Sequence, residues 1–139
     1  MTAEMNTTIR EIMMNSPVTL APGDTLDLAN DIMSLGRIRH IPIVEDGRVE
    51  GVLSQRDLFG AAVAIVLGLK SREQKDLLKS FRIKEVMRHP VITISPDASV
   101  KEAAQLMAEK KIGCLPVVEA NNLVGLVTLT NVLRYVVNL

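Results

Sequence analysis

The sequence repeats itself at an offset of 74 residues, and this constrains the fold more than any other feature. When Met13 is laid on Met87 (87 − 13 = 74), residues 9–63 align with residues 83–137 without a gap. Thirteen of the aligned pairs are identical, whereas ordinary composition would give about three or four by chance. A duplication of this length predicts one small structural motif that is present twice.

Each copy has the pattern of a strand, a helix, two strands and a second helix. A short extended segment leads through a proline to an amphipathic helix, for which Thr25 and Ser99 are the expected N-caps and Gly36 the expected end in the first copy. Two strands joined by a hairpin follow, and a second helix begins at Ser54 or Thr128. The predicted extended segments are 17–20 and 91–94, the predicted strands are 41–44, 49–53, 115–118 and 123–127, and the predicted turns are Asp46–Gly47 and Asn121–Asn122.

These patterns predict an α/β (α+β) fold of two tandem βαββα repeats. We expect a tail at 1–8, a first repeat at 9–63, a helical linker at 64–82 and a second repeat at 83–139. Within the linker, Ser71 and Gln74 suggest a fresh helix cap. A three-stranded sheet with two helices on one side leaves its other face uncovered. We therefore expect the repeats to pack face to face about a pseudo-two-fold axis, with ligand-sized clefts between equivalent edges.

Composition argues against several classes of partner. Sixteen basic side chains balance sixteen acidic ones and only three residues are aromatic, which disfavours nucleic-acid binding. The longest apolar run, 58–69, is shorter than the roughly 20 residues that span a bilayer, and the first residues lack a signal-peptide pattern. The single cysteine, Cys114, excludes an internal disulfide and is typical of a reducing compartment. We therefore expect a cytoplasmic protein without a membrane or nucleic-acid partner.

A pattern Gly-x-x-Ser/Thr-x-x-Asp/Asn occurs in both copies, at Gly51, Ser54 and Asp57 and again at 125, 128 and 131. It describes a strand that ends where a helix begins, and the unpaired N–H groups at such a terminus attract anions. A carboxylate there can accept hydrogen bonds from both hydroxyls of a ribose. The simpler interpretation is a plain helix cap, and the two roles are compatible.

A basic segment, Arg37 to His40, precedes the first predicted hairpin. Arginine at a strand entrance can hold a phosphate by two parallel hydrogen bonds. The alternative is a solvated helix end, where cations are favoured by the helix dipole. The second copy has Gly113 and Cys114 at the positions of Arg39 and His40, so the capacity to bind phosphate is greater in the first copy.

Catalytic and metal chemistry find little support in the sequence. The only histidines are His40 and His89, and Cys114 lies in an apolar run where a small packing residue is expected. Metal-ligand spacing and a glycine-rich phosphate loop are both missing from the sequence. We therefore expect a protein that is not an enzyme and needs no metal or cofactor.

The two repeats resemble the CBS domain, which is named from cystathionine β-synthase. The resemblance rests on IPIVEDGRVEGVLSQRDL (41–58), on LPVVEANNLVGLVTLTNVL (115–133), and on the opening segments Ile9–Met13 and Ile83–Met87. It implies a stand-alone CBS pair that binds an adenosine-containing ligand in the cleft between its repeats and forms a homodimer.

The resemblance also implies a role for each site residue. Ser54 with Asp57, and Thr128 with Asn131, would each hold a ribose. The remaining residues would border the base (Thr19, Ala21, Thr93, Ser95), pack on it (Ile38, Ile112) or reach phosphate (Arg39, His40). Arg56 is also expected among the ligand-binding residues.

Two departures from the family pattern predict unequal sites. Asn131 replaces the usual acidic residue, and an amide offers a single acceptor oxygen. Gly113 and Cys114 replace a polar or basic pair. We expect one good site at Asp57 and a weaker or empty one at Asn131.

Three functions remain in competition at this point. The first is a sensor that binds an adenine nucleotide or related adenosyl ligand and modulates a partner protein. The second is a ligand-free structural or dimerisation adaptor, and the third is an enzyme, for which no catalytic set converges. AMP, ADP, ATP, S-adenosylmethionine, a dinucleotide and a cyclic dinucleotide are all open as ligands.

Overall fold

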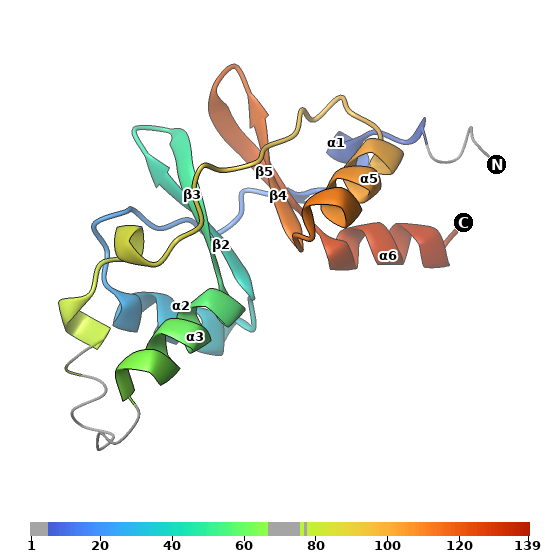
Figure 1. Ribbon diagram of the computed structural model, residues 1–139. Coiled ribbons are helices and arrows are strands. Elements are labelled where there is room, and N and C mark those ends of the chain that lie inside the picture. The colour runs from blue at the N-terminus through green and yellow to red at the C-terminus, as the bar shows by residue number, and fades with distance from the viewer. Residues whose placement is uncertain (1–5, 67–75, 77) are drawn as a thin grey trace. The chain divides into compact units, whose positions relative to one another are not determined.

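The computed structural model describes residues 6–66, 76 and 78–139, and its chain divides into two compact units (Figure 1). The 18–91 unit is Val18–Val91. The 92–139 unit is Ile92–Leu139 together with the chain up to Pro17. The face-to-face packing of the repeats stays a prediction.

The 18–91 unit is a β-hairpin with helices at its base. In chain order it contains α2 (Leu26–Gly36), β2 (His40–Glu45), β3 (Arg48–Ser54), α3 (Gln55–Val66) and the 3-10 turn η2 (Ile83–Glu85). β2 and β3 pair antiparallel, and the predicted extended segment before α2 adds a single parallel bridge, from Leu20 to Ile43. Figure 1 shows α2 and α3 together at the end of the hairpin where β3 runs into α3.

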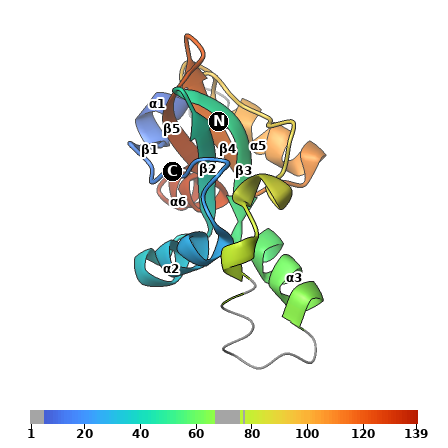
Figure 2. The same cartoon turned by 90° about the vertical axis from the view of Figure 1, so that its left-hand side faces the viewer.

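The 92–139 unit repeats this arrangement and adds one short strand. It contains α1 (Ile9–Ile12), β1 (Met14–Asn15), α5 (Val100–Lys110), β4 (Cys114–Glu119), β5 (Asn122–Thr128) and α6 (Leu129–Val137). Its sheet has the order β1-β5-β4, and Figure 2 shows β1 beside β5. Ile94 bridges Val117 as Leu20 bridges Ile43.

The two hairpins have the same register at the offset of 74. His40 pairs with Ser54 and Cys114 with Thr128, and a bulge follows Ile43 in one hairpin and Val117 in the other. The prediction of two repeats of mixed helix and strand is therefore confirmed. The predicted box at Ser99 is also confirmed, because its hydroxyl accepts from Glu102 N at 3.1 Å and its own N–H donates to the Glu102 carboxylate at 2.9 Å.

One local prediction is wrong by one residue. The second turn is Ala120–Asn121, both with positive φ, and Asn122 already belongs to β5. Its partner Asp46–Gly47 is where it was predicted, with φ of 53° and 80°. The first helix ends at Gly36 as predicted, and the left-handed residue that follows its last turn is Arg37, with φ of 53°.

The opening segment of each repeat packs on the other repeat. Ile9 N donates to Ala98 O at 2.8 Å, and Arg10 N donates to Pro96 O at 2.9 Å. The equivalent bonds, from Ile83 N to Asp24 O at 2.8 Å and from Lys84 N to Pro22 O at 3.0 Å, tie the second opening segment to the first repeat. The boundaries of the compact units therefore differ from those of the sequence repeats, because each opening segment belongs to the unit of the other repeat.

This exchange reaches into both hydrophobic cores. Ile9 is fully buried in the core of the 92–139 unit, and Ile83 is fully buried in the core of the 18–91 unit. The two cores otherwise use equivalent positions, for example Met33 and Met107 on α2 and α5. Each repeat therefore needs an isoleucine from outside its own βαββα segment to complete its core.

The linker predicted at 64–82 falls partly outside the described residues. α3 continues to Val66, and residues 76 and 78–80 are helical. The predicted cap at Ser71 and Gln74 lies outside the described residues. Among the described helices, none combines the length and the apolar character that crossing a membrane requires.

Candidate functional site

The residues predicted to hold a ribose in the first repeat meet where β2 and β3 reach α3. Ser54 ends β3, and its hydroxyl accepts a hydrogen bond from the backbone N–H of Asp57 at 3.0 Å. His40, at the start of β2, is the cross-strand partner of Ser54. Gln55 N donates to the carbonyl oxygen of Arg39 at 2.7 Å, which fixes Arg39 beside the same turn. One strand end and one helix start therefore gather four of the predicted residues.

Arg88 joins this group, and the sequence interpretation had missed it. Its Nε donates to the two carboxylate oxygens of Asp57 at 3.2 and 3.0 Å. Its backbone pairs with Val52 of β3 through two hydrogen bonds, at 2.9 and 3.2 Å, so the side chain starts beside the strand that carries Ser54. The repeat alignment contained a sign of this ion pair. Arg88 aligns with Met14 and Asp57 aligns with Asn131, so both charges are missing from the other repeat.

Burial and the neighbouring charges favour the neutral form of His40. Burial lowers the pKa of His40 below its ordinary 6.5, the positive charges of Arg39 and Arg88 lower it further, and Asp57 opposes them. Because charge interactions weaken with distance, their effect on the pKa of His40 indicates that Arg39, Arg88 and Asp57 lie near it. The four side chains therefore form one electrostatic cluster. We call these residues the Asp57 cluster, with Ser54 as its cap.

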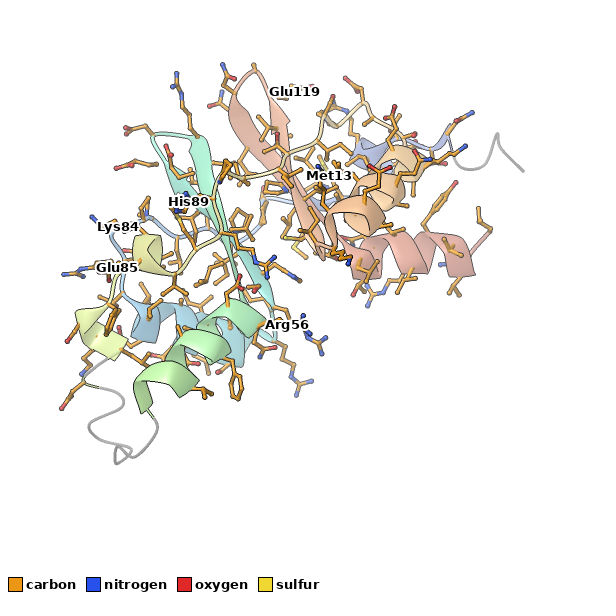
Figure 3. All side chains as sticks on the ribbon, in the orientation of Figure 1. Met13, Arg56, Lys84, Glu85, His89 and Glu119 are labelled. Carbon is orange, nitrogen blue, oxygen red and sulfur yellow. The ribbon has the colours of Figure 1, made fainter. Side chains whose placement is uncertain are left out.

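The other residues predicted for this half of the site have local positions of their own in the same unit. Thr19 and Ala21 are exposed on either side of the bridging Leu20, and Ala21 N donates to the carboxylate of Asp24 at 2.8 Å. Ile38 is half-buried and packs on the core of the unit. Arg56 is exposed on the first turn of α3, where Figure 3 shows its side chain.

The second repeat uses the same positions for a closed helix cap. Asn131 Oδ1 accepts from both the backbone N–H and the hydroxyl of Thr128, at 2.8 and 2.9 Å. The backbone N–H of Asn131 donates to the Thr128 hydroxyl at 3.3 Å. The single acceptor oxygen of the amide is therefore already engaged twice within the cap.

The remaining residues of the second half-site have local roles of their own. Ser95 Oγ accepts from Asp97 N at 3.2 Å, Thr93 is exposed, and Ile112 packs against the core of its unit. Leu129 N donates to Gly113 O at 2.9 Å, the equivalent of the bond at Arg39.

The two half-sites share their backbone geometry and differ in charge. The first has Arg39, His40, Arg56, Asp57 and Arg88, and the second has Gly113, Cys114, Thr130, Asn131 and Met14 at the aligned positions. Every ionisable group of the first half-site is replaced by an uncharged polar, apolar or small residue, apart from the buried thiol of Cys114. The first half-site is therefore the one equipped to bind an anion.

Within the described part of the chain, no group of three or more His, Cys, Asp or Glu residues is placed to hold a metal ion.

The family model of the CBS domain matches residues 9–64 and again residues 83–138. The chain belongs to the CBS domain family. The curated relatives include the CBS domain-containing protein YhcV of Bacillus subtilis, which is 31% identical over 121 residues, covering 87% of this chain and 79% of that protein.

Solved CBS structures agree with the fold. A putative acetoin utilization protein, AcuB, from Vibrio cholerae is 34% identical, with a TM-score of 0.79 and coverage of 96% of this chain and 93% of that one. The CBS domain pair of protein MJ0100, solved in complex with 5-methylthioadenosine and S-adenosyl-L-methionine, is 25% identical, with a TM-score of 0.79 and coverage of 95% and 97%.

Proposed function

We propose that this CBS pair is a non-catalytic regulatory sensor that binds an adenine nucleotide or related adenosyl ligand between its repeats and thereby modulates a partner protein. The Asp57 cluster is the observation that carries the proposal. A carboxylate lies at a strand-to-helix junction beside a capping hydroxyl, a neutral histidine and arginine side chains. Such a set offers acceptors for ribose hydroxyls and donors for phosphate.

Each predicted residue then has a role in binding. Ser54 and Asp57 hold the ribose, and Arg39, His40 and Arg56 approach the phosphate. Thr19, Ala21 and Ile38 line the base. In the second repeat Thr93, Ser95, Ile112, Thr128 and Asn131 form a weaker site, since the Asn131 oxygen is engaged in its own cap. The MJ0100 pair, with 5-methylthioadenosine and S-adenosyl-L-methionine bound, supports an adenosyl ligand for this chain.

We further propose that the chain forms a homodimer through α6. Leu129, Leu133, Val136 and Val137 recur at helical spacing on that helix and are each at least 46% exposed. An apolar stripe of this kind is more stable when a second surface covers it. Leu133→Glu should shift the sedimentation coefficient toward the monomer, and the matched charge change Gln105→Glu, at an exposed position of α5, should not. A chain that is monomeric before any substitution would contradict the dimer.

The second candidate function is a ligand-free adaptor. It is favoured by the Thr128–Asn131 cap, which accounts for both residues without a ligand. An adaptor would rely on the α6 surface and leave the Asp57 cluster unused.

Retention of ligand through purification separates the two candidates. The protein is purified, denatured to release bound small molecules, and the supernatant is analysed by mass spectrometry. The refolded protein is then titrated with AMP, ATP and S-adenosylmethionine by calorimetry. A retained adenosyl compound, or saturable binding of one, supports the sensor. No retained compound and no binding heat, from protein with a native circular-dichroism spectrum, supports the adaptor.

A further inference from the structure

We propose that Arg88 is the residue that makes this sensor prefer phosphorylated adenosyl ligands over the cationic S-adenosylmethionine. This inference rests on the proposed function and narrows its ligand class. Arg88 lies outside both the Gly51–Asp57 pattern and the basic segment Arg37–His40. It reaches the Asp57 cluster from the segment that follows η2.

The geometry of the ion pair leaves both partners with capacity for a ligand. The hydrogen bonds from Arg88 to Asp57 come from Nε alone. The two terminal nitrogens of Arg88 make no hydrogen bond to a described side chain. A carboxylate has about four acceptor positions, and one shared N–H leaves room for two ribose hydroxyls. Arg88 can therefore orient the carboxylate with Nε while its terminal N–H groups take a phosphate oxygen.

Exposure distinguishes the roles of the two side chains. The Asp57 side chain is 17% exposed, whereas that of Arg88 is 56% exposed. The carboxylate is thus the shielded part of the pair, and the guanidinium is the part that solvent and solutes reach. A ligand phosphate would meet Arg88 with little desolvation of the carboxylate beneath it.

The charge of the cluster favours an anion. Arg39 and Arg88 carry two positive charges against the one negative charge of Asp57, and burial lowers the pKa of His40, which favours its neutral form. Arg56 adds a further positive charge on the adjacent first turn of α3. A phosphate would relieve this excess, whereas a sulfonium cation would add to it. At the aligned positions of the second repeat all of these charges are missing, so the selectivity belongs to the first half-site alone.

Substitution by the residue of the other repeat provides the test. Arg88→Met removes the guanidinium and keeps a long apolar stem, as in the aligned Met14. We expect its affinity for AMP and ATP to fall about tenfold, the effect of losing a charge-assisted hydrogen bond. The affinity for adenosine, which has no phosphate, should change less than about threefold, and that for S-adenosylmethionine should stay equal or increase.

Two further variants control the experiment. Lys84→Met removes a charge from the same segment at η2, away from Arg56 in Figure 3, and should leave all affinities unchanged. Arg88→Gln, which keeps a donor, replaces Arg88→Met if the latter does not unfold cooperatively. Equal loss of AMP and adenosine binding would overturn the proposal, because a purely structural Arg88 would weaken both. Unchanged AMP binding would also overturn it. Wild-type protein that binds no adenosyl compound would overturn the proposed function together with this inference.

Discussion

A Cβ atom added at Gly51 would lie 2.7 Å from the carbonyl oxygen of Arg88. The same relationship recurs in the other unit, where a Cβ at Gly125 would lie 2.9 Å from the carbonyl oxygen of Met14 and 2.5 Å from the sulfur of Met13. Because neither glycine has a side chain, the backbone at Arg88 and at Met14 can lie directly on the middle of a β-strand. This close approach also delivers Arg88 to Asp57.

Gly51→Ala should destabilise the protein, since the added methyl group meets backbone and cannot be relieved by a side-chain rotation. We expect a loss of about 1–3 kcal/mol in the free energy of unfolding, the usual cost of overpacking, measured by urea denaturation. Gly60→Ala is the matched control, because nothing lies within 4 Å of a Cβ there. As an alanine inside α3 it should stabilise by up to about 1 kcal/mol. Similar effects of the two substitutions would contradict the close packing.

Ile9→Ala and Ile83→Ala should be equally damaging, although Ile9 precedes both βαββα segments. Each isoleucine is fully buried in the core of the repeat that its opening segment covers. Truncating such a side chain typically costs about 2–5 kcal/mol. Leu35→Ala, at a leucine that is 87% exposed, serves as the control in the same denaturation series. If Ile9→Ala behaved like Leu35→Ala, the exchange of opening segments would be wrong.

The pKa of His40 predicts a loss of stability at mildly acidic pH. Because its pKa is lowered in the folded state from 6.5, the unfolded chain takes up a proton first as the pH falls. Stability therefore decreases as the pH drops below about 6.5 and through the lower folded pKa. His40→Gln removes this contribution, so the fall in Tm between about pH 7.5 and pH 5.5 should be smaller than in the wild type. An identical fall in both proteins would count against the buried neutral histidine.

Asp57→Ala should lower adenine-nucleotide affinity more than Asn131→Ala. The Asp57 carboxylate has acceptor positions left beside Arg88, whereas the Asn131 oxygen already accepts two bonds from Thr128. Calorimetric titration with AMP measures both variants. Equal losses would contradict the asymmetry between the half-sites.

The repeat, the hairpins and the helix caps were predictable because they depend on local patterns. Alternating apolar residues place β2 and β4 within a residue of their observed bounds, and Ser99 with Glu102 locates the start of α5. The turn at Ala120–Asn121 was misplaced because asparagine is a stronger turn former than alanine. Only the strand register, in which Glu119 pairs with Asn122, places Asn122 in β5.

The exchange of opening segments was not predictable, because alignment of repeats says which residues are equivalent and not which copy they contact. Ile9 fits the apolar surface of either repeat equally well by composition. For the same reason Arg88 went unnoticed, since it is 31 residues from Asp57. The Ser54–Asp57 junction was found because a single turn of helix contains it.

A thermal-shift panel on ligand-free protein tests the sensor most directly. AMP, ADP, ATP, NAD, S-adenosylmethionine and cyclic dinucleotides are each added to wild-type protein and to Asp57→Ala. A ligand at about 100 times its dissociation constant adds roughly 2.7 kcal/mol to stability, which raises Tm by a few degrees in a chain of this size. We expect such a shift with a phosphorylated adenosyl ligand, and its loss in Asp57→Ala. No shift with any compound, or a shift that Asp57→Ala retains in full, would contradict it.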